Sequence, residues 1–128
     1  MRQGPLGPVQ DKGWTDPAAY SSEGANARAL IALVRAARAP GIEVVILLLP
    51  EGTTLRTSIP PEAMRCLRDT LTRGFGPAAP PVIDLRAALP DSMFHDPLHP
   101  SLAGRQRATR LLIEALRSRP APDHPRHD

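Results

Sequence analysis

The residues of this chain whose types and spacing could do chemistry lie together in the stretch FHDPLHPSLAGRQ, which begins at Phe94. Asp96 and His99 are three residues apart on a segment braced by Pro97 and Pro100, which lowers the entropy lost in holding the two side chains together. An aspartate within reach of the imidazole Nδ1–H could fix the tautomer of the ring and leave Nε2 free as a general base. The pattern therefore predicts an acid/base pair at Asp96 and His99.

The same residues allow two other interpretations. Asp-Pro commonly forms a turn, and His-Pro-Ser could simply lead into a helix capped by Ser101. A metal site would use His95, Asp96 and His99. That interpretation fails because Pro97 breaks the helix that histidine ligands at i and i+4 require. No metal or other cofactor is therefore expected, and the choice between a site and a plain turn depends on where the stretch lies in the fold.

Three helices and two strands are expected to position this stretch. The hydrophobic pattern indicates a helix over 26–38, a strand over 42–49, a helix from 61 to about 75, a strand over 82–85 and a helix over 101–117. The first strand, IEVVILLL, is almost continuously apolar, which is typical of a strand buried on both faces of a parallel sheet. The segment 50–60, which joins this strand to the second helix, is expected to be a loop.

This order of elements predicts an α/β fold with parallel strands joined by a crossover. We expect a three-layer, flavodoxin-like parallel sheet that is incomplete in this chain, because a two-stranded sheet is marginal alone and a strand this apolar needs neighbours on both sides. The chain would then be the C-terminal part of a larger doubly wound domain, or it would pair with another chain. Residues 1–22 are expected to be an irregular leader, 23–118 the α/β part and 119–128 a disordered tail.

Both candidate polar loops follow the carboxyl ends of the predicted strands, where sites form in open α/β sheets. Glu51 to Arg56 follows the first strand, and Asp84 to His99 follows the second. This position favours a site at Asp96 and His99 over a plain turn. Glu51 and Arg56 could contact a substrate or the missing part of the domain, and they could equally be a solvated loop pair.

The block from Asp96 to Gly104, placed after the last strand and before the last helix, resembles the Asp-x-x-His-Pro block of SGNH (GDSL-type) hydrolases. The region from Gly13 through GIEVVILLLPEGTTLR to Leu116 also looks like the C-terminal half of SGNH-hydrolase-like proteins from bacteria. The resemblance implies a flavodoxin-like sheet and the chemistry of a serine esterase or acyltransferase acting on a small ester or an O-acyl carbohydrate. It also implies that Asp96 and His99 are the acid/base pair of the triad.

The serine and oxyanion-hole blocks of that family do not occur in this sequence. There is no Gly-Asp-Ser, and Asn26, the only asparagine, lacks the Gly-x-Asn-Asp setting of the family. Ser21 and Ser22 lie in AYSSEG, which has no strand-to-helix elbow, so we expect them to lead into a helix. An Asp/His pair without a nucleophile and oxyanion donors has nothing to activate. The chain alone is therefore expected to be a very poor esterase, with its serine upstream or in another polypeptide.

A function of a different class is a non-catalytic α/β module that binds a partner through an unpaired sheet edge. In that case Asp96 and His99 are ordinary loop residues, and replacing His99 changes nothing. The partner at the sheet edge would be the missing N-terminal half or another chain. Both functions remain open from the sequence.

Composition argues against nucleic acid as a partner. The chain has a formal net charge of +3, and its basic residues are nearly all arginines, since Lys12 is the only lysine. These arginines, such as Arg35 and Arg38, are scattered over the predicted outer faces of helices, and only 3% of residues are aromatic. A platform for stacking bases is therefore not expected.

Nothing in the sequence indicates a membrane partner. The N-terminal residues MRQGPLGPVQDKGW lack the apolar core of a signal peptide, and no run approaches the roughly 18 apolar residues of a membrane span. Cys66 is the only cysteine, so no intrachain disulfide can form, and its apolar neighbours predict a packed residue. The cellular compartment is left open.

Overall fold

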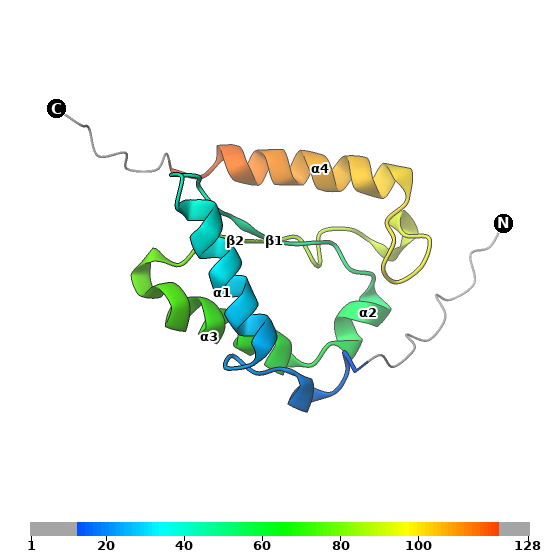
Figure 1. Cartoon of the computed structure of the whole chain (residues 1–128). Coiled ribbons are helices and arrows are strands. Elements are labelled where there is room, and N and C mark those ends of the chain that lie inside the picture. Colours follow the sequence, from blue (N-terminus) through cyan, green and yellow to red (C-terminus); the bar gives the residue numbers. More distant parts are fainter. Residues whose placement is uncertain (1–12, 121–128) are drawn as a thin grey trace.

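The computed structural model describes residues 13–120 of the chain. In chain order its helices and strands are α1 (Ala25–Arg38), β1 (Ile46–Leu48), α2 (Thr53–Ser58), α3 (Pro61–Phe75), β2 (Val82–Asp84) and α4 (Leu102–Arg117), with single 3-10 turns at Pro17–Ala19, Gly76–Ala78 and Asp91–Met93. Figure 1 shows α4 along one side of the two strands and α1 and α3 along the other. The predicted α/β fold is confirmed.

The sheet is formed by two parallel strands. β1 and β2 pair in the register Ile46 with Val82, Leu47 with Ile83 and Leu48 with Asp84, and α2 and α3 connect them. The parallel pairing expected from the order of elements is therefore confirmed. Within residues 13–120, no third strand joins either edge of this sheet.

The first strand is shorter and less buried than the sequence predicts. A strand over 42–49 with both faces covered was expected, whereas β1 has three residues, all half-buried. Leu49 keeps 67% of its surface exposed. The reason is that β2 supplies only three ladder positions, on one edge, and a longer strand would need a further neighbour to pair its backbone and cover its side chains.

The expected loop over 50–60 contains the helix α2. Leu55 is buried in the core, which fixes one face of this short helix. The backbone N–H of Thr53 at its start donates to Asp91 Oδ1 at 2.8 Å, so a carboxylate far along the chain satisfies a donor that the helix itself cannot. The prediction of a loop was wrong because Asp91, which caps this helix, is distant in sequence. The residues next to 53–58 therefore give no signal for the start of the helix.

The helix α3 begins and ends as its sequence predicts. Pro61 is in the first turn, where its missing N–H costs nothing, and Glu62 lies beside it at the positive end of the helix dipole. Gly76 ends the helix with a φ of 54°, a conformation that glycine adopts without strain. Gly74 lets α3 approach α1, because a Cβ there would lie 2.8 Å from Ile31 Cγ1.

Two arginines of α1 pack against α3, although the helical pattern placed them on the solvent side. The guanidinium carbons of Arg35 and Arg38 lie 5.9 and 5.2 Å from the centre of the Phe75 ring, which is within cation–π range. Arg38 also donates to the carbonyl of Ala78 at 2.7 Å. These arginines therefore cover the C-terminal end of α3 and join the two helices.

The core is small and leaves the inner face of α4 partly uncovered. Its buried apolar side chains come from α1, α2, α3, β2 and the segment that follows β2: Ala27, Val34, Leu55, Leu71, Ile83, Leu85, Leu89 and Phe94. The only buried residue of α4 is Gly104, and the predicted inward residue Leu116 is exposed. Leu33 of α1, also expected to face inward, is exposed. Part of the apolar surface of the sheet and of α4 is therefore left exposed by the described residues.

The expected leader and tail lie mostly outside the described residues, namely 1–12 and 121–128. The described part of the leader, 13–22, is irregular apart from the turn Pro17–Ala19, which Asp16 caps. Arg119, in the expected tail, forms an ion pair with Glu43. Among the described residues, no helix combines the length and the apolar character that a membrane crossing requires.

Candidate functional site

Asp96 and His99 lie on a closed loop, residues 94–101, between β2 and α4. An antiparallel bridge joins Phe94 to Pro100 across the base of the loop, and the N–H of His95 donates to the carbonyl of His99 at 2.9 Å. The loop is therefore a tight turn with its own backbone pairing, which limits the freedom of the two side chains.

The base of this loop is anchored in the core and on α4. Phe94 keeps only 1% of its surface exposed. A Cβ on Gly104 would lie 2.4 Å from the carbonyl oxygen of Met93, so α4 can approach the loop this closely only with glycine at that position. The N–H of Gly52, just before α2, donates to the carbonyl of Pro97 at 2.9 Å. Both predicted polar loops therefore meet at the carboxyl end of the sheet.

The helix that follows the loop starts with the cap that its sequence predicts. Ser101 precedes α4, and its hydroxyl oxygen accepts a hydrogen bond from the N–H of Gly104 at 3.2 Å. The N–H of Ser101 donates to the carbonyl of Met93 at 2.8 Å. The direction of α4 is thereby coupled to the position of the loop.

The structure brings the side chains of Asp96 and His99 together. Asp96 Oδ2 lies 2.7 Å from His99 Nδ1, and its Oδ1 accepts from the backbone N–H groups of Leu98 and His99, both at 2.8 Å. With the carboxylate ionised, Nδ1 carries the proton of this bond and Nε2 is the ring nitrogen left for another partner. The His99 side chain is 70% exposed, so a second reacting group can approach it.

The turn interpretation also has support from this geometry. The two bonds from Leu98 and His99 to Oδ1 are those of an aspartate that closes a turn on its own backbone. They occupy one carboxylate oxygen, while the other holds the imidazole. The turn and the pair therefore coexist, and the turn is what fixes the carboxylate for His99; the catalytic role of the pair stays a prediction.

Hydrogen bonding lowers the pKa of Asp96 to about 2. The largest cause is the hydrogen bond from His99, followed by those from the backbone N–H groups of Leu98 and His99, which all favour the ionised carboxylate. Asp96 is therefore an anion over the range in which histidines titrate. It is placed to stabilise a positive charge on the imidazole ring.

We expect an NMR titration of the Asp96 carboxyl carbon to give a pKa of about 2. This pKa lies below the value of about 3.9 for an aspartate in the unfolded chain. The ionised carboxylate therefore stabilises the folded loop fully at pH values above about 3.9, and this contribution is lost as the pH falls toward about 2. In His99→Ala the pKa should rise yet stay below its ordinary value, since the backbone donors remain. His95→Ala should leave it unchanged, and an Asp96 pKa insensitive to His99→Ala would contradict the pairing.

Arg56 ties the ends of the two strands together. Its guanidinium donates to the backbone carbonyls of Glu51 and Arg86, at 3.1 and 3.3 Å. The expected pair of Glu51 and Arg56 is thus in contact, but through the backbone of Glu51. This geometry gives Arg56 a structural role, and a role in substrate binding stays a prediction.

One carboxylate oxygen of Glu51, Oε2, is both buried and without a hydrogen-bond partner among the described residues. Burial raises the pKa of Glu51, against the opposing effect of the Arg86 and Arg56 charges. A buried acceptor without a donor is costly, so a ligand or partner that donates a hydrogen bond to Glu51 would remove this cost.

An ion pair that the sequence analysis missed lies beside these residues. Arg86 donates to both oxygens of Asp84, at 3.0 and 2.7 Å, and this lowers the pKa of Asp84. The only signal in the sequence was an acid two residues before an arginine at a strand end. That pattern is common on surfaces and carries no specific prediction.

An apolar hollow of about 610 Å³ lies between β1, the 94–101 loop and α4. Its wall includes Leu47 and Leu49 of the β1 region, Glu51, and Leu98 and Pro100 of the loop. His99 does not line the hollow, but the residues on both sides of it do. The hollow is large enough for a small ligand, and its apolar lining suits an acyl chain.

The remaining candidates lie elsewhere. Ser21 and Ser22 precede α1, as expected, where the Ser21 hydroxyl accepts from the N–H of Glu23 at 3.2 Å. In the part of the chain that the structure describes, no three His, Cys, Asp or Glu side chains are grouped to hold a metal ion.

Comparison with known proteins identifies no relative: no family model, no curated protein and no solved structure matches this chain. What the fold and the site define is a small α/β unit with an exposed Asp/His pair after its second parallel strand. The resemblance to SGNH hydrolases therefore rests on the residues of the chain themselves.

Proposed function

We propose that this chain carries the acid/base part of a serine-hydrolase site of the SGNH type, which hydrolyses an ester or transfers an O-acyl group. The observation that carries the proposal is the 2.7 Å contact between Asp96 Oδ2 and His99 Nδ1, with the imidazole exposed on the loop between β2 and α4. His99 is the general base, and Asp96 orients it and stabilises its protonated form.

In this reaction a serine hydroxyl gives its proton to His99 Nε2 as its oxygen attacks the ester carbonyl. The protonated ring then returns that proton to the leaving alkoxide when the carbon–oxygen bond breaks. Asp96 stays ionised throughout, which agrees with its low pKa. The serine and the oxyanion donors come from a segment or polypeptide other than the described residues, because no Gly-Asp-Ser occurs in the sequence.

The fold supports the same proposal. Helices on both sides of parallel strands are the layers of a flavodoxin-like sheet, of which this chain supplies two strands. Since alternate residues of a parallel strand direct their backbone groups to the same side, Leu47 turns its N–H and C=O away from β2. A serine-bearing segment would add its strand at this outer edge of β1, beside the apolar hollow. The acyl part of a small ester or O-acyl carbohydrate substrate would lie in that hollow.

The test is to restore the missing serine. The DNA directly upstream, or another gene of the same organism, should encode a Gly-Asp-Ser segment that binds the purified chain. The mixture should hydrolyse p-nitrophenyl acetate and react with a fluorophosphonate on that serine, whereas the chain alone should be no faster than free imidazole. Absence of any such segment within about one domain length, ~150 residues, together with failure of every candidate polypeptide to activate the chain, would sink the proposal.

A second candidate function is a non-catalytic module that binds a partner chain at the sheet edge. The observation that favours it is the exposed apolar surface at β1, where Leu49 is largely uncovered beside an unpaired edge. Light scattering on the purified chain would then show an oligomer or a stable complex, and His99→Ala would change neither binding nor any activity. Esterase activity that depends on His99 would exclude this alternative.

A further inference from the structure

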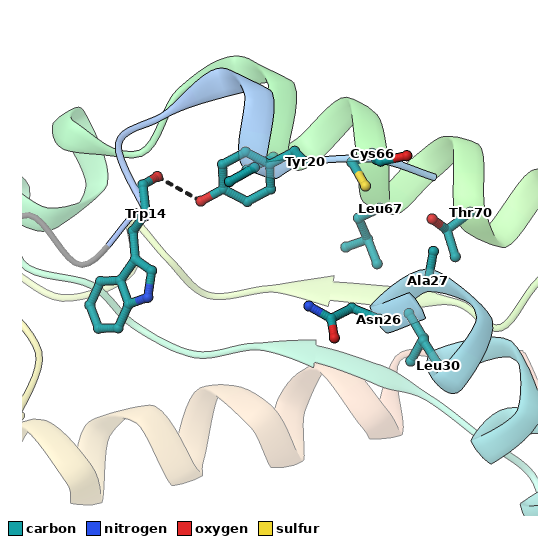
Figure 2. Close-up of a pocket in the computed structure, with 12 residues that line it drawn as sticks. Trp14, Tyr20, Asn26, Ala27, Leu30, Cys66, Leu67 and Thr70 are labelled. Atoms are coloured by element: carbon teal, nitrogen blue, oxygen red, sulfur yellow. Dashed lines mark hydrogen bonds between the residues drawn. The ribbon is translucent and has the colours of Figure 1, made fainter. Parts of the chain in front are cut away.

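A second cavity, of about 460 Å³, lies between the segment before α1, the first half of α1 and α3 (Figure 2). None of the residues that line it also lines the hollow beside the Asp96–His99 loop, so the two are separate spaces. Its volume falls within the range of roughly 300–1,000 Å³ that is usual for small-ligand sites. The proposed hydrolase chemistry makes no use of it.

The lining of this cavity carries no formal charge. Its twelve residues include no Asp, Glu, Lys, Arg or His. An ionised ligand would give up hydration here without meeting an opposite charge, which is costly. The lining therefore favours a neutral ligand over a charged one.

Three polar groups lie toward one end of the cavity, namely the Tyr20 hydroxyl, the Trp14 carbonyl and the Asn26 amide. The Tyr20 hydroxyl donates to the carbonyl of Trp14 at 2.7 Å, which ties these two aromatic residues together. Figure 2 shows the amide end of Asn26 turned away from α1, toward these two residues. The amide makes no hydrogen bond with another residue in the range 13–120. It offers two donors and one acceptor, the set that a second amide matches best.

The opposite wall is mostly apolar, with the Thr70 hydroxyl as a polar group beside Ala27. Leu30 and Ala27 of α1 and Leu67 of α3 face the space from two helices that pack against each other (Figure 2). This wall takes a ring or a short chain, while Asn26 takes a polar group at the other end. We infer that the cavity is a binding site for a small neutral molecule that joins an apolar ring or chain to an amide group.

The probe for this site is acetanilide, a neutral aromatic amide, and the readout is the fluorescence of Trp14, the only tryptophan of the chain. We expect a saturable change with a Kd of about 1 mM, as is usual for a ligand of this size. Benzoate, of similar size but charged, should bind at least about tenfold more weakly. No saturable response up to about ten times that Kd, or equal binding of the two probes, would overturn the inference.

Two variants locate the binding. Asn26→Leu should weaken acetanilide about fivefold or more, because one end of the ligand loses its hydrogen bonds. Ala63→Phe should abolish the response by filling the space from α3. Ala103→Phe adds the same ring on the exposed surface of α4, away from the cavity, and should bind acetanilide normally. Unchanged binding by the Ala63→Phe protein, shown to be folded by circular dichroism, would place acetanilide elsewhere and overturn the assignment.

Discussion

We expect His99→Ala to lower kcat/KM for p-nitrophenyl acetate on the order of 10³-fold or more when the chain is combined with the serine-bearing segment proposed above. Loss of the histidine would leave the serine hydroxyl without a base when it attacks the ester, and the leaving alkoxide without an acid when the carbon–oxygen bond breaks. The 2.7 Å contact with Asp96 identifies His99 as the ring that is held in position.

His95→Ala is the matched control for this experiment. His95 is exposed on the same loop. Its backbone N–H donates to the carbonyl of His99, and replacement of the side chain by alanine keeps this hydrogen bond. Activity of the His95→Ala protein should stay within about twofold of the parent, as expected for an exposed side chain outside the chemistry. Equal losses in the two variants would show that the loop matters only as structure, and would remove His99 from the mechanism.

Phe94→Ala should lower the free energy of unfolding by about 3–5 kcal/mol, the usual cost of emptying a buried aromatic site. Phe94 is the most buried large side chain among the described residues, and its backbone bridges Pro100 at the base of the loop. Urea denaturation monitored by circular dichroism would measure this decrease as a lower midpoint concentration of urea, with an unchanged dependence of the unfolding free energy on urea concentration (m value). The loop that holds Asp96 and His99 loses its anchor in the same variant.

Leu102→Ala provides the control for that loss. Leu102 is also a large apolar residue near the loop, at the start of α4, but 62% of its surface is exposed. Its replacement should therefore cost well under about 1 kcal/mol. Similar costs for Phe94→Ala and Leu102→Ala would contradict the view that the base of the loop is part of the core.

Elements with local signals were predictable from the sequence, and elements that depend on distant residues were not. The helices α1, α3 and α4 carry apolar periodicity and end signals such as Pro61, Gly76 and Ser101, which act within a few residues. The helix α2 was missed because its start is satisfied by Asp91, 38 residues away in sequence. The length of β1 was overestimated because an apolar run shows that a strand could be buried but not that other segments cover it. Among the described residues only β2 pairs with β1.

The candidate site divides in the same way. Asp96 and His99 lie three residues apart on a proline-braced segment, so their contact follows from local geometry and was predictable. The buried oxygen of Glu51 and the bonds of Arg56 to two strand ends depend on how separate segments meet. Contacts between segments that are distant in sequence cannot be predicted from residue types and local spacing alone.

The close approach of α4 to the loop also gives a way to search for relatives. Because a Cβ at Gly104 would clash with the Met93 carbonyl, we expect relatives of this chain to keep glycine at this position even where other residues of α4 differ. An aspartate, a histidine three residues on, proline and serine next, and glycine three residues after the serine form a fingerprint whose last member is dictated by packing. Genomes could be scanned with this fingerprint for chains that keep the loop, including any that also contain a Gly-Asp-Ser block.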